Sequence, residues 1–91
     1  MDSILQSSKE CYITGATTEL HKHHIFFGPR RSASERYGLW VWLRADWHNM
    51  ADYGVHFSRV LDLRLKQKAQ EEFEHTHSHE EFMRIIGKNY L

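Results

Sequence analysis

The stretch His21-Lys22-His23-His24-Ile25-Phe26-Phe27-Gly28 decides how this chain folds and what chemistry it can carry. It holds three of the eight histidines within four positions and then enters an apolar segment that ends at a glycine. On an extended backbone successive side chains point to opposite faces. His23 and His24 therefore point in opposite directions, so one can face a metal ion while the other faces a substrate.

Working outward from this stretch, the pattern predicts two strands and a short helix. Residues 20–27 form the first strand, residues 28–32 a loop, and residues 38–43 a second strand rich in β-favouring side chains. Such strands favour an antiparallel pair. Residues 45–53 then form a short helix with Asp46 as its N-cap, which Gly54 ends. Before the stretch, residues 1–10 read as a loose lead-in and residues 11–15 as a brief extended segment that ends in a turn.

After Ser58 the spacing of the apolar residues becomes that of an amphipathic helix. Ser58 is a suitable N-cap, and Ser78 with Glu81 forms a capping box that opens a last helix ended by Gly87. The apolar residues of the first helix recur every four positions, at Leu61, Leu65, Ala69 and Phe73. Those of the last helix are Phe82, Ile85 and Ile86. Two packing helices are therefore expected after the strands.

Composition bounds the class of protein. Ninety-one residues make one domain, and 41% apolar with 13% aromatic residues argue against disorder. Twelve Lys and Arg balance twelve Asp and Glu, yet residues 22–44 carry five basic residues against Glu35 alone. This basic half can bind phosphate. The single cysteine excludes an internal disulfide, and no apolar run has signal-peptide or membrane length, so we expect a soluble, intracellular protein.

His23-His24-Ile25, a second strand and then His48-Asn49 resemble the HNH endonuclease motif. From Gly54-Val55-His56-Phe57 to the end, the chain is similar to a group of small phage-encoded HNH proteins, and the resemblance covers nearly everything from residue 4. It implies an α+β fold of the ββα-metal (His-Me finger) class, with two antiparallel strands, a short helix and two C-terminal helices. Residues 1–91 are then one domain, with a lead-in at 1–10, the core at 11–57 and a helical part at 58–91.

The resemblance also implies roles for individual residues. His24 takes the position of the general base, and His23 and His48 take those of metal ligands. His56 is a candidate for a further ligand or a phosphate contact. Leu39 stands near where the middle Asn of the motif would fall. The residues expected to hold the DNA backbone, from charge alone, are Arg30, Arg31 and Arg36.

One divalent ion is the expected cofactor, and it could be magnesium, manganese, nickel or zinc. Three imidazoles favour a borderline transition ion in affinity, although availability can favour a harder one. Relatives of this kind hold a structural zinc between two cysteine pairs. Here Cys11 remains, while Thr14, Arg44 and Trp47 occupy the other positions. No structural zinc is expected, and Trp47 is expected to fill the space by packing.

The remaining histidines and the tryptophans receive ordinary structural interpretations. His75, His77 and His79 lie in a polar stretch between helices and are expected at the surface, and His21 is read as structural. The three tryptophans (Trp40, Trp42 and Trp47) are read as core residues rather than as a platform for base stacking.

Our main hypothesis is a divalent-metal-dependent DNA endonuclease of phage or prophage origin that works in the host-cell cytoplasm. The alternative is a non-catalytic protein on the same scaffold, which binds DNA or acts as a recombination accessory or anti-defence factor on a host or phage protein. A third hypothesis is an interaction domain that dimerises through its C-terminal helices.

Overall fold

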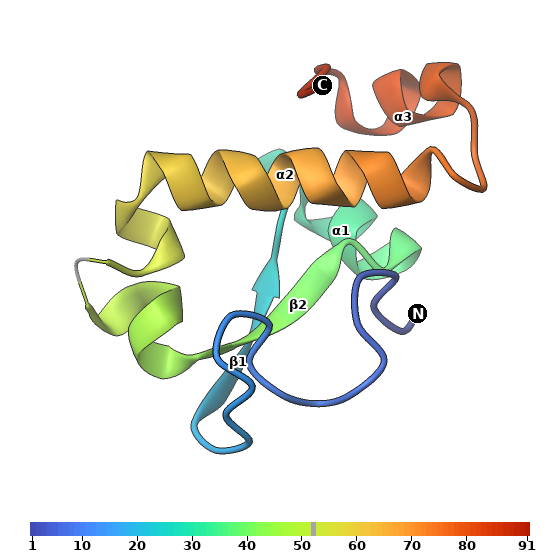
Figure 1. Cartoon of the computed structure of the whole chain (residues 1–91). Coiled ribbons are helices and arrows are strands. Elements are labelled where there is room, and N and C mark those ends of the chain that lie inside the picture. Colours follow the sequence, from blue (N-terminus) through green and yellow to red (C-terminus); the bar gives the residue numbers. More distant parts are fainter. Residues whose placement is uncertain (52) are drawn as a thin grey trace.

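The computed structural model describes residues 1–51 and 53–91, which form a small α+β fold around a two-stranded antiparallel sheet (Figure 1). Strand β1 (Leu20–His24) pairs with strand β2 (Trp40–Arg44). The register sets His23 opposite Val41 and His24 opposite Trp40. The predicted antiparallel pair is confirmed, although β1 ends three residues earlier than expected.

The predicted loop at residues 28–32 is wrong. The chain forms a 3-10 turn, η1 (Gly28–Arg30), and then helix α1 (Arg31–Tyr37). Pro29 suits a first helical turn because its fixed φ angle is already helical. With only seven residues, α1 is too short to produce a readable apolar period, and this is why the sequence pattern misses it.

The helix predicted at residues 45–53 with Asp46 as N-cap is also corrected. A π-helical turn, η2 (Asp46–Met50), follows β2, and the next element is a 3-10 turn, η3 (Val55–Phe57). Asp52, within the predicted helix, lies outside the described residues. The Asp46 carboxylate does not cap a helix. It accepts a hydrogen bond from the Tyr53 hydroxyl at 2.7 Å and pairs with the Arg44 guanidinium at 3.4 Å.

The two C-terminal helices are confirmed as α2 (Arg59–Phe73) and α3 (His79–Ile86). The Ser58 hydroxyl accepts a hydrogen bond from the backbone N–H of Leu61 at 3.2 Å, and Ser78 accepts one from Glu81 at 3.1 Å. Gly87 ends α3 in the left-handed conformation. Figure 1 shows α2 crossing over the sheet and α3 folding back beside the C-terminal half of α2.

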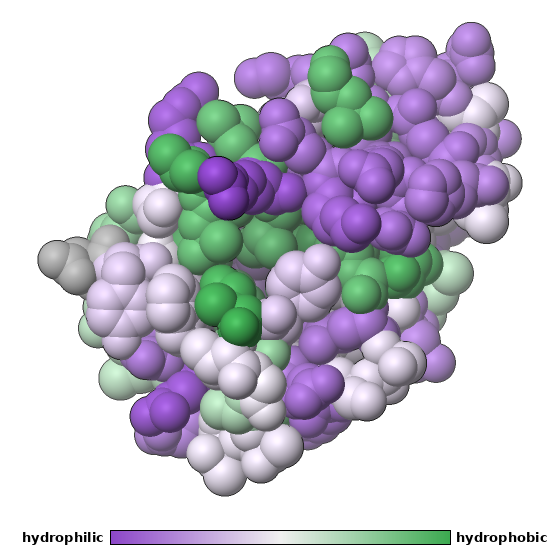
Figure 2. All heavy atoms as spheres, viewed as in Figure 1, coloured by the Kyte–Doolittle hydropathy of each residue, from purple (hydrophilic) through white to green (hydrophobic). Residues whose placement is uncertain are grey.

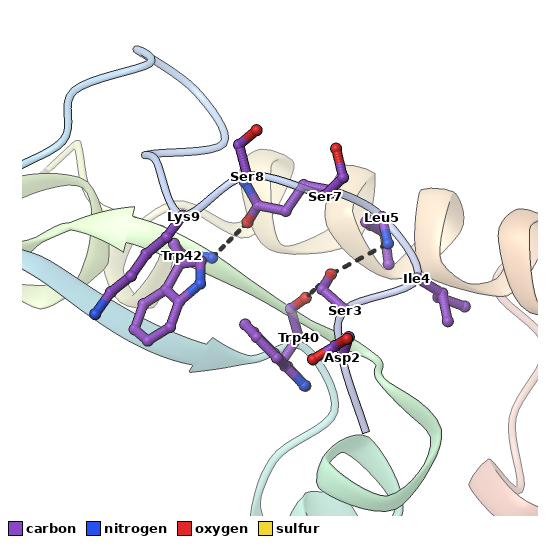
Figure 3. A pocket seen from close by; sticks show the side chains of 10 residues that line it. Asp2, Ser3, Ile4, Leu5, Ser7, Ser8, Lys9, Trp40 and Trp42 are labelled. Atoms are coloured by element: carbon purple, nitrogen blue, oxygen red, sulfur yellow. Dashed lines mark hydrogen bonds between the residues drawn. The ribbon is translucent and has the colours of Figure 1, made fainter.

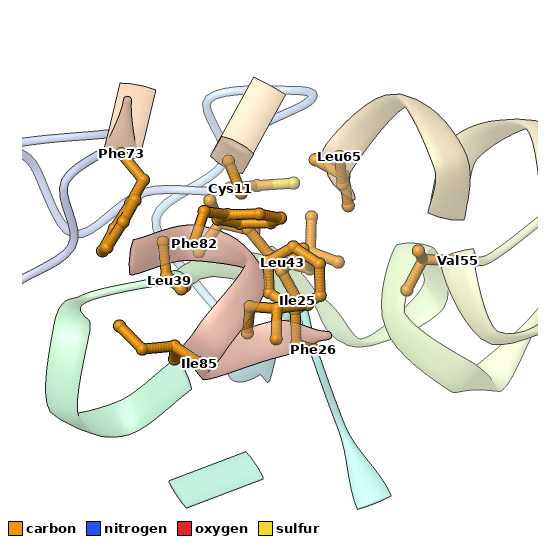
Figure 4. Close-up of a cluster of buried hydrophobic side chains, with 13 residues drawn as sticks. Cys11, Ile25, Phe26, Leu39, Leu43, Val55, Leu65, Phe73, Phe82 and Ile85 are labelled. Atoms are coloured by element: carbon orange, nitrogen blue, oxygen red, sulfur yellow. The ribbon is translucent and has the colours of Figure 1, made fainter. Parts of the chain in front are cut away.

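The core lies between the sheet, α2 and α3, and Figure 4 shows side chains from all of these elements meeting there. The predicted apolar faces are confirmed at Leu65, Ala69 and Phe73 on α2, which are buried, and at all three predicted positions on α3. The largest fully buried apolar side chains are Phe73, Phe82, Ile25, Leu39 and Leu43. Hydrophilic residues cover the outer side of the C-terminal half of α2, with apolar residues beneath it (Figure 2).

The N-terminal segment is not the loose lead-in that the sequence suggested. Its backbone runs beside β2 (Figure 3). Just before that strand, the amide of Ile4 donates to the carbonyl of Gly38 at 2.9 Å. The Ser3 hydroxyl donates to the carbonyl of Trp40, and the Gln6 side chain accepts from the amide of Trp42 at 2.6 Å. A Cβ at Gly38 would overlap the Asp2 carbonyl, so this close approach requires glycine. The sequence pattern did not predict this pairing, because the segment joins β2 through polar side chains and backbone groups and shows no periodic apolar pattern.

Residues 11–15 form a tight turn rather than an extended segment. The amide of Gly15 donates to the carbonyl of Cys11 at 2.8 Å, and the amide of Cys11 donates to the carbonyl of Ala16 at 2.8 Å. Trp40 is buried as expected, whereas Trp42 and Trp47 are only partly buried.

Among the described residues, the helices lack the length and apolar character needed to cross a membrane.

Candidate metal centre

Strand β1 separates the two adjacent histidines as the alternation predicts. His23 points to the buried face and is 1% exposed, and the rings of Phe27, His48 and His56 lie around its own ring. His24 points to the other face, toward α1. The two imidazoles therefore meet different surroundings although their backbones are adjacent.

The two short turns after β2 bring in His48 and His56. Gly54 lies between them in a confined position: a Cβ there would come within 2.8 Å of the Asp46 carbonyl oxygen and 3.0 Å of that of Ala51. Only glycine lets η3 pack this closely against η2 without a shift of the backbone. This packing places His56 beside His48.

His23, His48 and His56 form a convergent triad. One ring nitrogen of each lies within 4.8 Å of the other two, so the three side chains could hold a metal ion. The Nε2 atoms of His48 and His56 are 3.1 Å apart. Two nitrogens bound to one tetrahedral ion at ~2.0–2.1 Å lie about 3.3 Å apart, so this pair already fits a shared ion and the whole triad would contract by at most about 1.5 Å.

Burial favours the neutral form of two members of this triad, His23 and His48. Desolvation, followed by repulsion from His48 and His56, lowers the pKa of His23 to about 3. Desolvation and the neighbouring imidazoles, His56 first, lower the pKa of His48 to about 4. Neutral imidazoles are the form that binds a metal ion.

One buried polar atom also supports a ligand at this site. The Nε2 atom of His23 has no hydrogen-bond partner among the described residues. Leaving such an atom unsatisfied costs on the order of 1–3 kcal/mol. A metal ion bound by the triad would satisfy this atom.

His24 forms a separate ionic cluster with residues from β1 and α1. Its Nε2 atom lies 2.6 Å from the Glu35 carboxylate, whose other oxygen accepts from Lys22 at 3.2 Å. The hydrogen bonds from His24 and then Lys22 lower the pKa of Glu35. Sequence reasoning missed Glu35 because it lies on the helix that the pattern did not predict.

The triad and His24 share one hollow of about 210 Å³. Its lining comprises Lys22, His23, His24, Phe27, Arg31, His48 and His56. Of the three arginines proposed for the DNA backbone, Arg31 is the one that reaches this hollow. Arg30 instead donates to the carbonyl of Ile85 at 3.2 Å, and the Arg36 guanidinium lies 5.6 Å from the ring of Tyr37.

Ser34 supports the turn that follows β1, and sequence reasoning missed it. This fully buried hydroxyl donates to the carbonyl of Phe26 at 2.6 Å and accepts from the amide of the same residue at 3.0 Å. Leu39, at the position expected for the motif Asn, is a fully buried core residue. Ser34 thus ties the segment that follows β1 to helix α1.

The four positions that hold zinc ligands in the HNH proteins compared above have other contacts here. These positions are Cys11, Thr14, Arg44 and Trp47. Burial raises the pKa of the Cys11 thiol, but hydrogen bonds from the Arg44 backbone and the Thr14 side chain oppose this, and the net shift is downward. Trp47 packs against the core and against Tyr53, with ring centroids 4.7 Å apart.

No protein-family model, no curated protein and no solved structure matches this chain. The resemblance to HNH proteins therefore rests on the motif residues of the sequence alone.

Proposed function

We propose that this chain is an HNH-type, divalent-metal-dependent endonuclease of phage or prophage origin that hydrolyses DNA phosphodiester bonds in the host cytoplasm. In this proposal β1, β2 and the turn η2 correspond to a ββα-metal core. The observation that carries it is the shared hollow, in which three convergent imidazoles, His24 and the cation Arg31 meet.

The chain would hold the ion through His23, His48 and His56. A divalent ion there supplies a Lewis acid that polarises the scissile phosphate and stabilises the departing oxygen. Arg31, at the rim, orients the negatively charged DNA backbone by charge-assisted hydrogen bonds.

His24 would act as the general base. When its Nε2 hydrogen is donated to Glu35 at 2.6 Å, the lone pair remains on Nδ1. That nitrogen can take the proton from the attacking water, while the Glu35 carboxylate stabilises the imidazolium that forms.

The experiment is relaxation of supercoiled plasmid by protein stripped of metal. Magnesium, manganese, nickel and zinc are added back one at a time. We expect nicking that needs a metal and that is lost in His24→Ala but kept in His75→Ala, whose side chain is 62% exposed and remote from the hollow. A folded protein that cleaves with none of these ions would refute the nuclease and leave a non-catalytic scaffold that binds DNA or a protein.

A further inference from the structure

His48 has a second contact, on the ring nitrogen that faces away from the triad. Its Nδ1 atom lies 3.1 Å from Nδ1 of His21, while its Nε2 atom lies 3.1 Å from Nε2 of His56. The rings of His21 and His48 meet edge to face, with centroids 5.2 Å apart and planes at 86°. His21 precedes His23 by two residues on β1, so both side chains lie on the same face of the strand.

This arrangement determines where the protons lie. A neutral imidazole carries one hydrogen, on one nitrogen, and only the other nitrogen has a lone pair for a metal ion. If Nε2 of His48 is the ligand atom that faces His56, its hydrogen is on Nδ1. The partner at that atom is Nδ1 of His21, which must accept and therefore carry its own hydrogen on Nε2.

We propose that His21 is a positioning residue, which fixes the tautomer and ring orientation of the metal ligand His48. The inference rests on the metal site of the proposed function but not on nuclease activity. An imidazole that ligates a metal usually donates its other N–H to a carboxylate, carbonyl or water, and these partners hold the ligand in place. Here a second imidazole has that role.

His21 is not a fourth ligand in this geometry. The group whose ligand atoms converge consists of His23, His48 and His56. The contact from His21 is made to Nδ1 of His48, on the side of the ring opposite the triad. An ion bound between His48 and His56 is thus separated from His21 by the ring of His48 itself.

The test measures Zn²⁺ affinity at pH 7.5 by competition with a chelating indicator. We expect His21→Ala to weaken Zn²⁺ binding by ~10–100-fold, the usual effect of losing such a partner. His21→Asn keeps an acceptor oxygen and should recover most of that loss. The matched control, His75→Ala, removes an exposed histidine from outside the site and should bind Zn²⁺ as the wild type does.

A second readout reports the proton directly. In ¹⁵N-edited spectra of the Zn²⁺-loaded wild type, His48 should carry its hydrogen on Nδ1 and bind through Nε2. Binding of Zn²⁺ through Nδ1 of His48 would overturn the proposal, whether or not any variant folds. Unchanged Zn²⁺ affinity in a folded His21→Ala protein would overturn it as well.

The same data distinguish this failure from failure of the proposed function. If the wild type binds Zn²⁺ no better than His48→Ala, the triad is not a metal site, and both proposals fall. If Zn²⁺ binds as expected but plasmid is not cut, the nuclease proposal is refuted, while the proposed role of His21 is retained.

Discussion

The chain carries two groups of three histidines, at opposite ends of the fold, and they behave differently. His23, His48 and His56 come from a strand and two short turns, and their ring nitrogens converge. The other group lies at the turn between α2 and α3 within five residues of sequence, and each member has its own neighbour. His75 lies by Glu72, His77 stacks on Phe73 with centroids 4.2 Å apart, and His79 contacts Glu74.

The difference teaches that nearness in sequence does not make a metal site. The histidines at the turn are close along the chain but diverge toward solvent and toward helix side chains. The triad is spread over residues 23–56, and burial combined with confined backbone packing makes it converge. The predictions that follow test this contrast, beginning with the largest effect.

Removing one member of the triad should abolish tight metal binding. We expect His48→Ala to weaken Zn²⁺ affinity by more than ~100-fold, beyond the ~10–100-fold typical of residues that only support a ligand. His79→Ala, from the other group, should change it by less than about twofold, because that side chain faces Glu74 and solvent. Isothermal titration calorimetry measures both. Equal losses of Zn²⁺ affinity in His48→Ala and His79→Ala would contradict the proposed difference between the two groups of histidines.

The metal-free protein should lose stability as the pH falls below about 6.5. The pKa of His23 in the fold is about 3, so the unfolded chain binds its proton first and the free energy of unfolding falls with pH. Through His23, the free energy of unfolding falls by at most ~1.4 kcal/mol for each pH unit below the pKa of the unfolded chain, and above that pKa it does not change. Half-buried His48 adds a smaller contribution of the same sign. Urea unfolding between pH 7.5 and 5 measures this before carboxylates titrate.

The matched variant for the pH experiment is His23→Leu, which removes the imidazole and should flatten the dependence between pH 7.5 and 5. His77→Ala removes a histidine of the other group and should retain the wild-type slope. A slope that is the same in His23→Leu and the wild type would show that burial of His23 is not its source.

Ser34→Ala should destabilise the fold and loosen the end of β1. The change leaves the amide and carbonyl of Phe26 without their buried partner, which costs about 1–3 kcal/mol. Ser32→Ala, on the exposed face of the same helix, should stay within about 0.5 kcal/mol of the wild type. Chemical denaturation measures both variants. If they behave alike, the Ser34 hydroxyl does not anchor this loop.

The smallest effect is expected at the helical end. Ser78→Ala removes the N-cap of α3 and should lower the free energy of unfolding by about 1 kcal/mol. Zn²⁺ affinity should not change, because α3 lies away from the triad. Ser7→Ala, at an exposed position of the N-terminal segment, is the neutral control for thermal unfolding. A marked loss of Zn²⁺ binding in Ser78→Ala would mean that the two ends are coupled.

Local rules predicted a large part of this molecule. Side-chain alternation separated His23 from His24, and a period of four residues identified the face of α2 with Leu65 and Phe73. The caps at Ser58 and Ser78 followed from residue type and spacing. These features depend on backbone geometry over a few neighbouring residues, so a sequence is enough to find them.

Longer-range features of the site escaped prediction. Glu35 and Ser34 lie on a helix too short to show a period, and the N-terminal segment joins β2 through backbone and polar groups. His56 was one candidate ligand among several, because its spacing of eight positions from His48 does not by itself place the two rings together. His21 was interpreted as structural because the motif does not require it, and nothing local indicates that its ring lies against that of His48.

The sequence by itself determined the secondary structure of the strands and long helices, which of two adjacent histidines faces the interior, and a set of residues able to bind metal. Only the tertiary structure decided which of the eight histidines meet. Convergence depends on the register of β1 against β2, on the close packing of η3 against η2 at Gly54, and on the packing of α2 against η3. These are contacts between distant segments, and their geometry exists only after the chain has folded.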